Sequence, residues 1–147
     1  MATDRFFVDT NLFLRYLTND IPEQAESIEM ILRRAMDGEI TLATNNLVIA
    51  EIVWTLESYY HLARQDIQSK VIAILNTPGL MIEHHDIILQ AILWYVEKNV
   101  EYIDAYNVAW LLNQDIHTAY TFDRRHFNRF KEIEVIVPVG RGKKEPP

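Results

Sequence analysis

Cysteine is absent from the 147 residues, which excludes disulfide bonds and thiolate metal sites and fits a reducing compartment. Glycine is scarce, with four residues, and none of them lies in a phosphate-cradling loop between a strand and a helix. Hydrophobic runs are short, such as residues 47–50 and 108–112, so no segment is long enough to span a bilayer. The N-terminus carries Asp4 and Asp9 where a secretory signal would need an apolar core. We therefore expect a cytoplasmic protein without a membrane segment.

The composition is that of one folded domain, because 49% of the residues are hydrophobic and a chain of this size buries roughly 70% of its unfolded surface. The net charge of −7 argues against a nucleic-acid partner, since counterion release from phosphates needs a basic face. The charges are unevenly placed, however, because acids crowd residues 23–39 and bases gather toward the C-terminus. These bases are Arg124, Arg125, His126, Arg129, Lys131, Arg141, Lys143 and Lys144. A basic binding face and a solvated face with a disordered tail explain them equally well.

Strand-like runs alternate with amphipathic helical patterns along the chain. The expected strands are residues 5–8, 40–43, 80–82, 119–122 and 135–137. The expected helices are residues 10–17, 20–38 including both caps, 45–60, 66–75, 86–98 and 103–114. In the second helix, Asp20 is the expected N-cap, with Glu23 as its capping-box partner. Strands separated by helices predict an α/β fold with a central, mostly parallel sheet flanked by helices. We expect one domain over residues 1–139 and a polar, disordered tail over residues 140–147.

Four carboxylates stand in or against otherwise apolar segments, namely Asp9, Glu51, Asp104 and Asp123. A lone buried carboxylate is energetically costly, and no lysine or arginine lies near Glu51 in sequence to form an ion pair. Asp9 and Asp123 each follow an expected strand, and ligands of parallel sheets collect at the carboxyl ends of the strands. Carboxylate oxygens are the ligands that Mg²⁺ and Mn²⁺ prefer. The pattern therefore predicts that the four acids meet around a divalent cation.

Four short motifs carry a resemblance to a known family. They are Val8-Asp9-Thr10-Asn11, Ala50-Glu51-Ile52, Glu101-Tyr102-Ile103-Asp104-Ala105 and Thr121-Phe122-Asp123. In this order the motifs resemble those of PIN-domain ribonucleases, and the length and layout are similar to the VapC-type toxins of bacterial and archaeal toxin–antitoxin pairs. The third motif departs from the family pattern, because Glu101 stands where the family has an aspartate. The resemblance implies a PIN-like three-layer sandwich with a central, mostly parallel sheet.

The resemblance also implies Mg²⁺- or Mn²⁺-dependent hydrolysis of RNA phosphodiester bonds, which agrees with the chemistry of the four acids. Asp9 and Asp104 are the candidates for direct metal ligands. Glu51 and Asp123 are expected to hold metal-bound waters, to position the attacking water, or to complete a second ion site. All four are therefore candidate catalytic and metal-binding residues.

Several neighbouring residues are candidates for supporting roles. Asn11 and Thr121 have short polar side chains that could fix the carboxylates by hydrogen bonds, although Asn11 is equally well explained as a helix-start residue and Thr121 as a strand residue. Arg124 and Arg125 are candidates for RNA binding. His126 is a candidate phosphate contact, with a plain surface position as the alternative. Three tryptophans on expected helices favour core or interface packing: Trp54, Trp94 and Trp110.

The expected partners are an RNA substrate, a small antitoxin protein and a second copy of the chain in a homodimer. Two other functions remain open: a housekeeping RNA-processing PIN nuclease and a non-catalytic PIN domain that binds RNA or protein. A haloacid-dehalogenase-type phosphatase is excluded, because it would need an aspartate two residues after Asp9 and the chain has Asn11 there.

Overall fold

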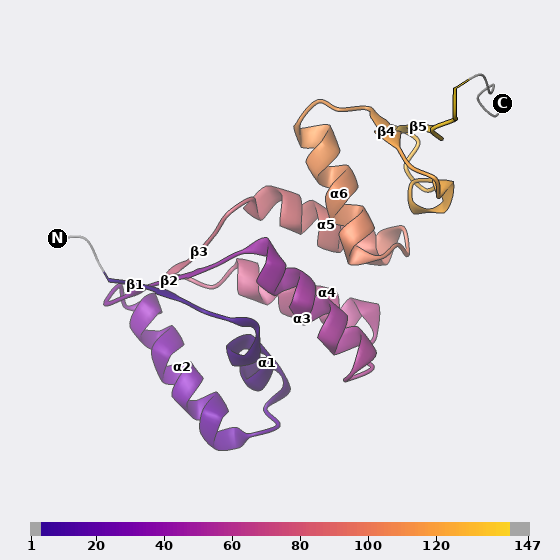
Figure 1. The fold of residues 1–147 in the computed structure, drawn as a ribbon. Coiled ribbons are helices and arrows are strands. Elements are labelled where there is room, and N and C mark those ends of the chain that lie inside the picture. Colours follow the sequence, from indigo (N-terminus) through magenta and orange to yellow (C-terminus); the bar gives the residue numbers. More distant parts are fainter. Residues whose placement is uncertain (1–3, 142–147) are drawn as a thin grey trace.

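Short strands alternate with helices in the order that the sequence predicts (Figure 1). The computed structural model describes residues 4–141. Its elements are β1 (Arg5–Phe7), α1 (Thr10–Thr18), α2 (Pro22–Met36), β2 (Thr41–Thr44), α3 (Asn46–Ser58), α4 (Arg64–Leu75), β3 (Leu80–Ile82), α5 (His85–Glu97), α6 (Tyr102–Asn113), β4 (Thr118–Tyr120), the short 3₁₀ helix η1 (Arg124–His126) and β5 (Glu134–Ile136). The predicted strands and helices are confirmed in order and type, and their ends are shifted by a residue or two. The sequence did not predict η1, and most of the expected tail lies outside the described residues.

The strands pair in parallel, as predicted, but they form two sheets where the sequence predicts one. The first sheet has the order β1-β2-β3, with Phe6 opposite Leu42 and Leu42 opposite Leu80. The second contains only β4 and β5, with Ala119 opposite Val135. Figure 1 shows the second sheet at the far end of α6, well away from β1. The α/β class is therefore confirmed, and the expectation of a single central sheet is corrected.

The main core lies where α3, α4 and α5 pack together beside the first sheet. Its most deeply buried side chains are aliphatic and come from all three helices, with Tyr95 as the one large aromatic among them. They are Ile49, Ile52, Leu56, Ile67, Val71, Ile88, Ile92 and Tyr95. Val8 and Leu42 from the first sheet belong to the same core. This packing fixes the end of β1 and anchors α3 through its inner face, so the two elements that carry the first two predicted site residues are held in place.

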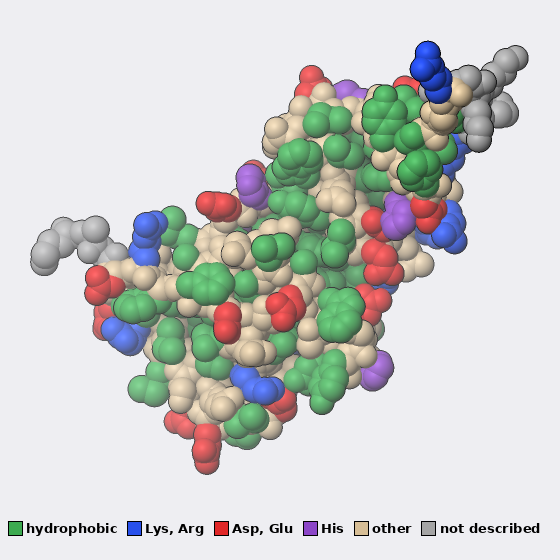
Figure 2. Space-filling view, viewed as in Figure 1, with side chains coloured by type: hydrophobic (Ala, Val, Ile, Leu, Met, Phe, Trp, Pro, Cys, Tyr) green, Lys and Arg blue, Asp and Glu red, His purple; other side chains and the backbone are tan. Residues whose placement is uncertain are grey.

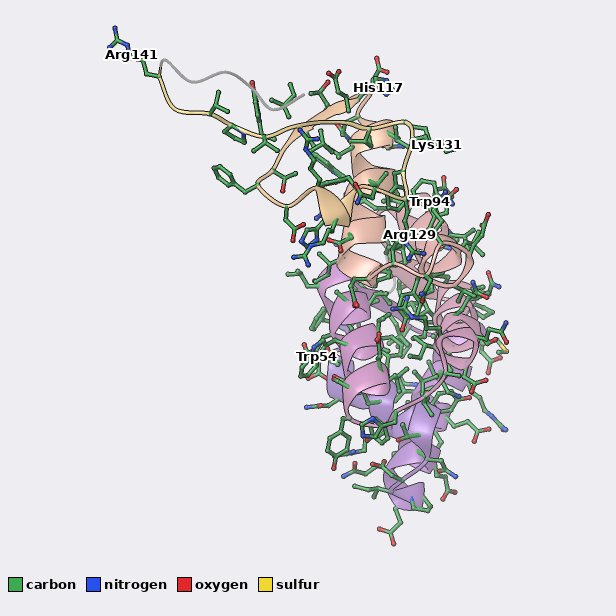
Figure 3. All side chains as sticks on the ribbon, turned by 90° about the vertical axis from the view of Figure 1, so that its right-hand side faces the viewer. Trp54, Trp94, His117, Arg129, Lys131 and Arg141 are labelled. Atoms are coloured by element: carbon green, nitrogen blue, oxygen red, sulfur yellow. The ribbon has the colours of Figure 1, made fainter. Side chains whose placement is uncertain are left out.

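A second, smaller core holds the C-terminal strands to the helices. Its buried members are Val108, Phe130 and Ile133. The Phe130 ring packs edge-on against Trp94 of α5 with centroids 5.1 Å apart, and Figure 3 shows Trp94 beside the loop that carries Arg129 and Lys131. The C-terminal region is thus attached mainly through α5 and α6, with no strand pairing to the first sheet among the described residues.

Side chains cap the N-termini of two helices, and the cap that the sequence predicts for a third is absent. Asp9 caps α1 and Asn45 caps α3, each through a side-chain oxygen that accepts a backbone N–H. The expected cap at Asp20 is wrong, because Ile21 occupies the N-cap position of α2 without a side-chain cap. The Asp20 carboxylate instead accepts hydrogen bonds from Arg15 Nη1 at 2.9 Å and Tyr60 Oη at 3.0 Å. Among residues 4–141, no helix is long and apolar enough to cross a membrane.

Candidate active site

Asp9 lies at the junction between β1 and α1. Val8 before it is buried, and its N–H donates to the Ala43 carbonyl of β2, so the end of the strand is fixed. Asp9 itself is exposed, and its Oδ1 accepts the Leu12 N–H at 3.3 Å. The carboxylate therefore satisfies an unpaired helix N–H and keeps its other oxygen free.

Glu51 lies on α3 and is linked to the same junction by a hydroxyl. Thr10 is buried, and its Oγ1 donates to Glu51 Oε2 at 3.1 Å. Because Thr10 directly follows Asp9, this hydrogen bond links Glu51 to the junction that carries Asp9. We call Asp9 and Glu51 the N-terminal acid pair.

The expectation that these two carboxylates are buried is wrong, since both Asp9 and Glu51 are exposed. The helical repeat explains Glu51, because Leu47 and Trp54, four residues before it and three after it, are 78% and 69% exposed. Glu51 therefore shares the outer face of α3 with Leu47 and Trp54, while Ile52 and Leu56 face the core.

The expected tryptophan packing is confirmed only in part. Trp94 packs against Phe130 in the second core. Trp54 projects from α3 away from the body of the protein (Figure 3), and Trp110 is 39% exposed. Trp54 therefore does not pack in the core, because the helical repeat places it beside Glu51 on the solvent-facing side, and interface packing stays a prediction for it.

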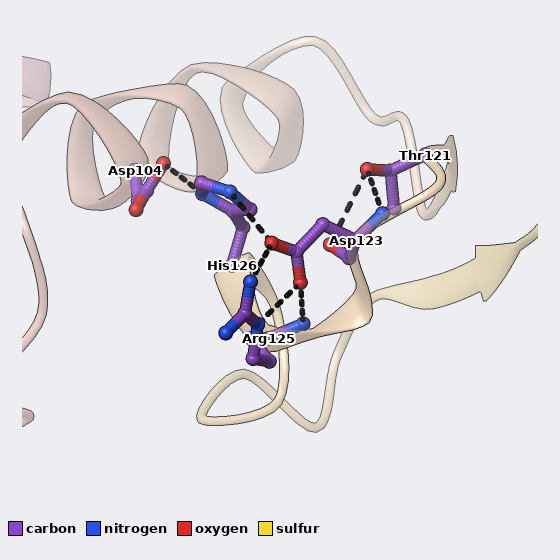
Figure 4. Close-up of polar contacts among 5 residues, drawn as sticks. All are labelled: Asp104, Thr121, Asp123, Arg125 and His126. Carbon is purple, nitrogen blue, oxygen red and sulfur yellow. Dashed lines mark hydrogen bonds and ion pairs between the residues drawn. The ribbon is translucent and has the colours of Figure 1, made fainter.

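Asp104 and Asp123 come together around one imidazole ring (Figure 4). His126 Nδ1 lies 2.9 Å from Asp104 Oδ1, and His126 Nε2 lies 3.5 Å from Asp123 Oδ2. Asp104 is in the first turn of α6, whereas Asp123 is the N-cap of η1 and His126 is its last residue. We call Asp104 and Asp123 the C-terminal acid pair.

Arg125 also binds this pair, through a two-pronged contact with Asp123. Its Nε lies 2.9 Å from Oδ1 and its Nη2 lies 2.8 Å from Oδ2 of the Asp123 carboxylate, and its backbone N–H donates to Oδ1 at 3.0 Å. These hydrogen bonds lower the pKa of Asp123 to about 2. The hydrogen bond to Asp104 and its negative charge raise the pKa of His126. The C-terminal acid pair is thus held by the guanidinium of Arg125 and the imidazole of His126 from its own chain.

A pocket between α3 and α6 lies beside the C-terminal pair. Its lining includes Trp54 and Glu57 from α3 together with Ile103, Asp104 and His126. The start of α6 is tied to the start of α3, because Tyr102 Oη donates to Asn46 Oδ1 at 2.7 Å. The two helices that carry Glu51 and Asp104 are therefore directly linked.

The four carboxylates do not form one cluster in this structure. Within residues 4–141, no three Asp, Glu or His side chains lie close enough together to hold one metal ion. In this structure the four acids thus lie in two separate pairs, and a metal site shared by all four stays a prediction. The donor chemistry still fits Mg²⁺ or Mn²⁺, because each pair offers carboxylate oxygens, and in the C-terminal pair these oxygens already bind cationic groups.

The supporting residues fall into three groups. Thr121 contacts Asp123 through the backbone, with its Oγ1 accepting the Asp123 N–H at 3.1 Å, so it positions this acid without touching its carboxylate. Across the described residues, no side-chain hydrogen bond joins Asn11 to an acid, and Thr10 has the role that was expected of Asn11. Arg124 and Arg125 are both exposed, and Arg125 binds Asp123. RNA binding by these two residues stays a prediction.

Thr10 and His126 are the residues whose importance the sequence understates. His126 was a candidate phosphate contact, and the structure places it between two of the candidate metal ligands. The sequence signal for Thr10 is its position directly after Asp9. Its bond to Glu51 spans 41 residues, so spacing alone does not reveal it.

Two comparisons with known proteins bear on this site. The family model described as PIN domain matches residues 6–133, a range that contains all four acids. A VapC ribonuclease from Aquifex aeolicus (strain VF5) is 28% identical over 118 residues, which cover 80% of this chain and 87% of that protein.

Proposed function

The chain belongs to the PIN-domain family, and on that premise we propose that it is a metal-dependent endoribonuclease that acts as the toxin of a toxin–antitoxin pair. The observation that carries the proposal is the position of Asp9 and Asp123, each of which follows the carboxyl end of a parallel strand within three residues. Each is also grouped with an acid on a helix, Asp9 with Glu51 and Asp123 with Asp104. The similarity to a VapC ribonuclease supports RNA as the substrate and an antitoxin as the partner.

The residues divide the chemistry between them. A divalent cation at such a site supplies an activated water and stabilises charge on the attacked phosphate, so no covalent nucleophile is needed. Asp9 and Asp104 would hold the cation, and Glu51 and Asp123 would hold or orient its waters. Thr10 fixes the orientation of Glu51 through its hydroxyl, as expected for a group that supports a metal ligand from behind.

We further propose that β4 pairs with the free edge of β1 in the working form, which would bring the two acid pairs together. Within residues 4–141, strand β1 is hydrogen-bonded only to β2, and β4 only to β5, so each of these strands has one edge without a partner strand there. Both sheets are parallel. Parallel pairing of β1 with β4 would place Asp9 and Asp123 at the same edge of one sheet.

Exposed side chains on the two edges support this pairing. Phe6 and Phe7 of β1 are 49% and 63% exposed, and Tyr120 and Phe122 at β4 are 77% and 81% exposed. Each square ångström of apolar surface that the pairing buries contributes roughly 25 cal/mol. Unpaired strand edges that carry aromatic side chains are also a liability in a soluble sheet, and pairing removes it.

The absence of native cysteine allows a direct test of the pairing. A chain with Phe7→Cys and Tyr120→Cys has only these two thiols, and a short bis-maleimide should join them within one chain. Either single-cysteine chain is the control and should give no intramolecular product. Cross-linked dimers would mean that a second copy supplies the strand, and the absence of any cross-link would contradict the pairing.

The contact between Arg125 and Asp123 supports the proposed mode of inhibition. A guanidinium fits this carboxylate with two hydrogen bonds, so an antitoxin that presents arginine or lysine would suit the acid pairs. Homodimer formation and a cytoplasmic location remain predictions from the sequence.

RNA cleavage by the purified protein tests the enzymatic proposal. Wild-type protein with Mn²⁺ or Mg²⁺ should cleave a mixed RNA substrate, EDTA should stop cleavage, and Asp104→Asn should lower the rate by more than roughly 100-fold, because it removes a direct ligand. Asp37→Asn is the matched control, since Asp37 is exposed at the end of α2 and far in sequence from all four acids. Equal cleavage by wild type and Asp104→Asn would refute the proposal.

Expression in a bacterial host tests the toxin assignment separately. Wild-type protein should arrest growth, Asp104→Asn should not, and a small protein encoded beside the gene should restore growth when it is co-expressed. A cleaving enzyme that leaves growth unchanged would favour the housekeeping nuclease.

A further inference from the structure

Arg125 and His126 lie on η1, the short 3₁₀ helix that follows Asp123 directly. Arg125 holds both oxygens of Asp123, and His126 reaches from Asp123 across to Asp104. Two adjacent residues therefore place one guanidinium and one imidazole on both acids of the C-terminal pair (Figure 4). No corresponding cation contacts Asp9 or Glu51 among the described residues.

We propose that Arg125 and His126 form an internal cationic clamp that sets the metal affinity of the site, because the clamp must release Asp104 and Asp123 before these acids can bind a divalent cation. This inference rests on the proposed function. Its physical basis is competition for the same oxygen atoms, since a carboxylate oxygen at 2.8–2.9 Å from a guanidinium nitrogen cannot also bind a cation at about 2.0–2.1 Å without rearrangement.

The position of the imidazole strengthens the argument. His126 faces Asp104 with one ring nitrogen and Asp123 with the other, so the ring itself occupies the space between the two carboxylates. A cation bound to Asp104, and a water of that cation held by Asp123, would need the space that the imidazole now occupies. His126 must therefore leave this position before the site binds an ion.

The exposure of the clamp makes its release feasible. The Arg125 side chain is 86% exposed and that of His126 is 47% exposed, whereas Asp104 and Asp123 are 20% and 35% exposed. An exposed ion pair of this kind contributes little to stability, and both side chains can turn into solvent without opening the core.

Titration with Mn²⁺ alone, followed by calorimetry and by the shift in melting temperature, tests the clamp without using cleavage. Arg125→Gln and His126→Ala should each bind Mn²⁺ between about threefold and thirtyfold more tightly than wild type, because each removes a competing cation. Arg125→Lys should lie between wild type and Arg125→Gln, since it keeps the charge but loses the two-pronged geometry. Lys131→Gln is the matched control, because it removes one positive charge from an exposed position in the same region, and it should bind like wild type.

Each outcome separates the clamp from the proposed function. If wild type binds Mn²⁺ and neither Arg125→Gln nor His126→Ala binds more tightly, the clamp is overturned and the nuclease proposal stands. If wild type binds no Mn²⁺ but a clamp variant does, the clamp is supported, because the native side chains then block metal binding completely. If no protein in the series binds Mn²⁺, both proposals fail. Melting of the metal-free variants in the same experiment confirms that each of them is folded.

Discussion

The two acid pairs of this protein are satisfied in different ways. Asp9 and Glu51 accept hydrogen bonds from a backbone N–H and a threonine hydroxyl, which are neutral donors. Asp104 and Asp123 are held by His126 and Arg125. Figure 2 shows acidic side chains next to histidine and basic side chains in the C-terminal region. The N-terminal acid pair thus has neutral hydrogen-bond donors, whereas the C-terminal acid pair contacts an arginine and a histidine of the same chain.

The supports beneath the two pairs differ as well. The N-terminal pair rests on the main core, which joins β1, β2 and the inner faces of three helices. The C-terminal pair rests partly on the second core of Val108, Phe130 and Ile133. Local stability follows buried apolar contact, so the C-terminal region should open more easily than the N-terminal one. We therefore expect the pair that carries the clamp to be the more mobile one.

Truncation of the second core should give the largest effect. Phe130→Ala should destabilise the C-terminal region by about 3–5 kcal/mol, because it removes a buried ring that packs on Trp94. Hydrogen exchange should then increase in β4, β5 and the end of α6 while the main core stays protected. Leu56→Ala in the main core should instead destabilise the whole chain by about 2–5 kcal/mol. Uniform loss of protection in Phe130→Ala would remove the distinction between the two regions.

A smaller effect is expected from the neutral donor of the N-terminal pair. Thr10→Val keeps the shape of the side chain but loses the hydroxyl that binds Glu51, and cleavage should fall by roughly 10-fold. Thr10→Ser keeps the hydroxyl and should restore most of the rate. An unaltered rate in Thr10→Val would show that Glu51 does not need this orientation.

The smallest expected effect is the pH dependence of the stability that the Arg125–Asp123 contact provides. Because Arg125 lowers the pKa of Asp123 to about 2, below the unperturbed value of about 3.9, their contact stabilises the folded state fully above pH 4. This stabilisation is lost as the pH falls toward 2. In EDTA, wild type should therefore melt slightly above Arg125→Gln at pH 5, and the difference should vanish near pH 2. A constant difference across this range would mean that Arg125 acts through packing.

Most of the fold was predictable from the sequence, because strand and helix periods are local. The positions of strands such as Leu80–Ile82 and helices such as Thr10–Thr18 follow from these patterns. The sheet arrangement was not predictable, since pairing β4 with β5 or with β1 depends on long-range contacts that leave no local signal. The prediction that Asp20 caps α2 was wrong for a similar reason, because the hydroxyl of Tyr60, which is distant in sequence, binds that carboxylate.

The candidate site was predictable as a list of residues, but its arrangement was not. Motif order identifies the four acids, while the Thr10–Glu51 bond and the His126 contacts arise only from the fold. The argument from burial failed at Glu51, because an apolar helix can carry a charged residue on its outer face at no desolvation cost.

The most direct test of the central claim is Mn²⁺ binding by wild type, Asp9→Asn and Asp104→Asn, measured by calorimetry at neutral pH. The two acids lie in separate pairs here, yet the proposed function assigns them to one metal site. We therefore expect that each variant weakens the same binding step by more than roughly tenfold. Wild-type Mn²⁺ affinity in either variant would contradict a site shared by the two halves of the protein.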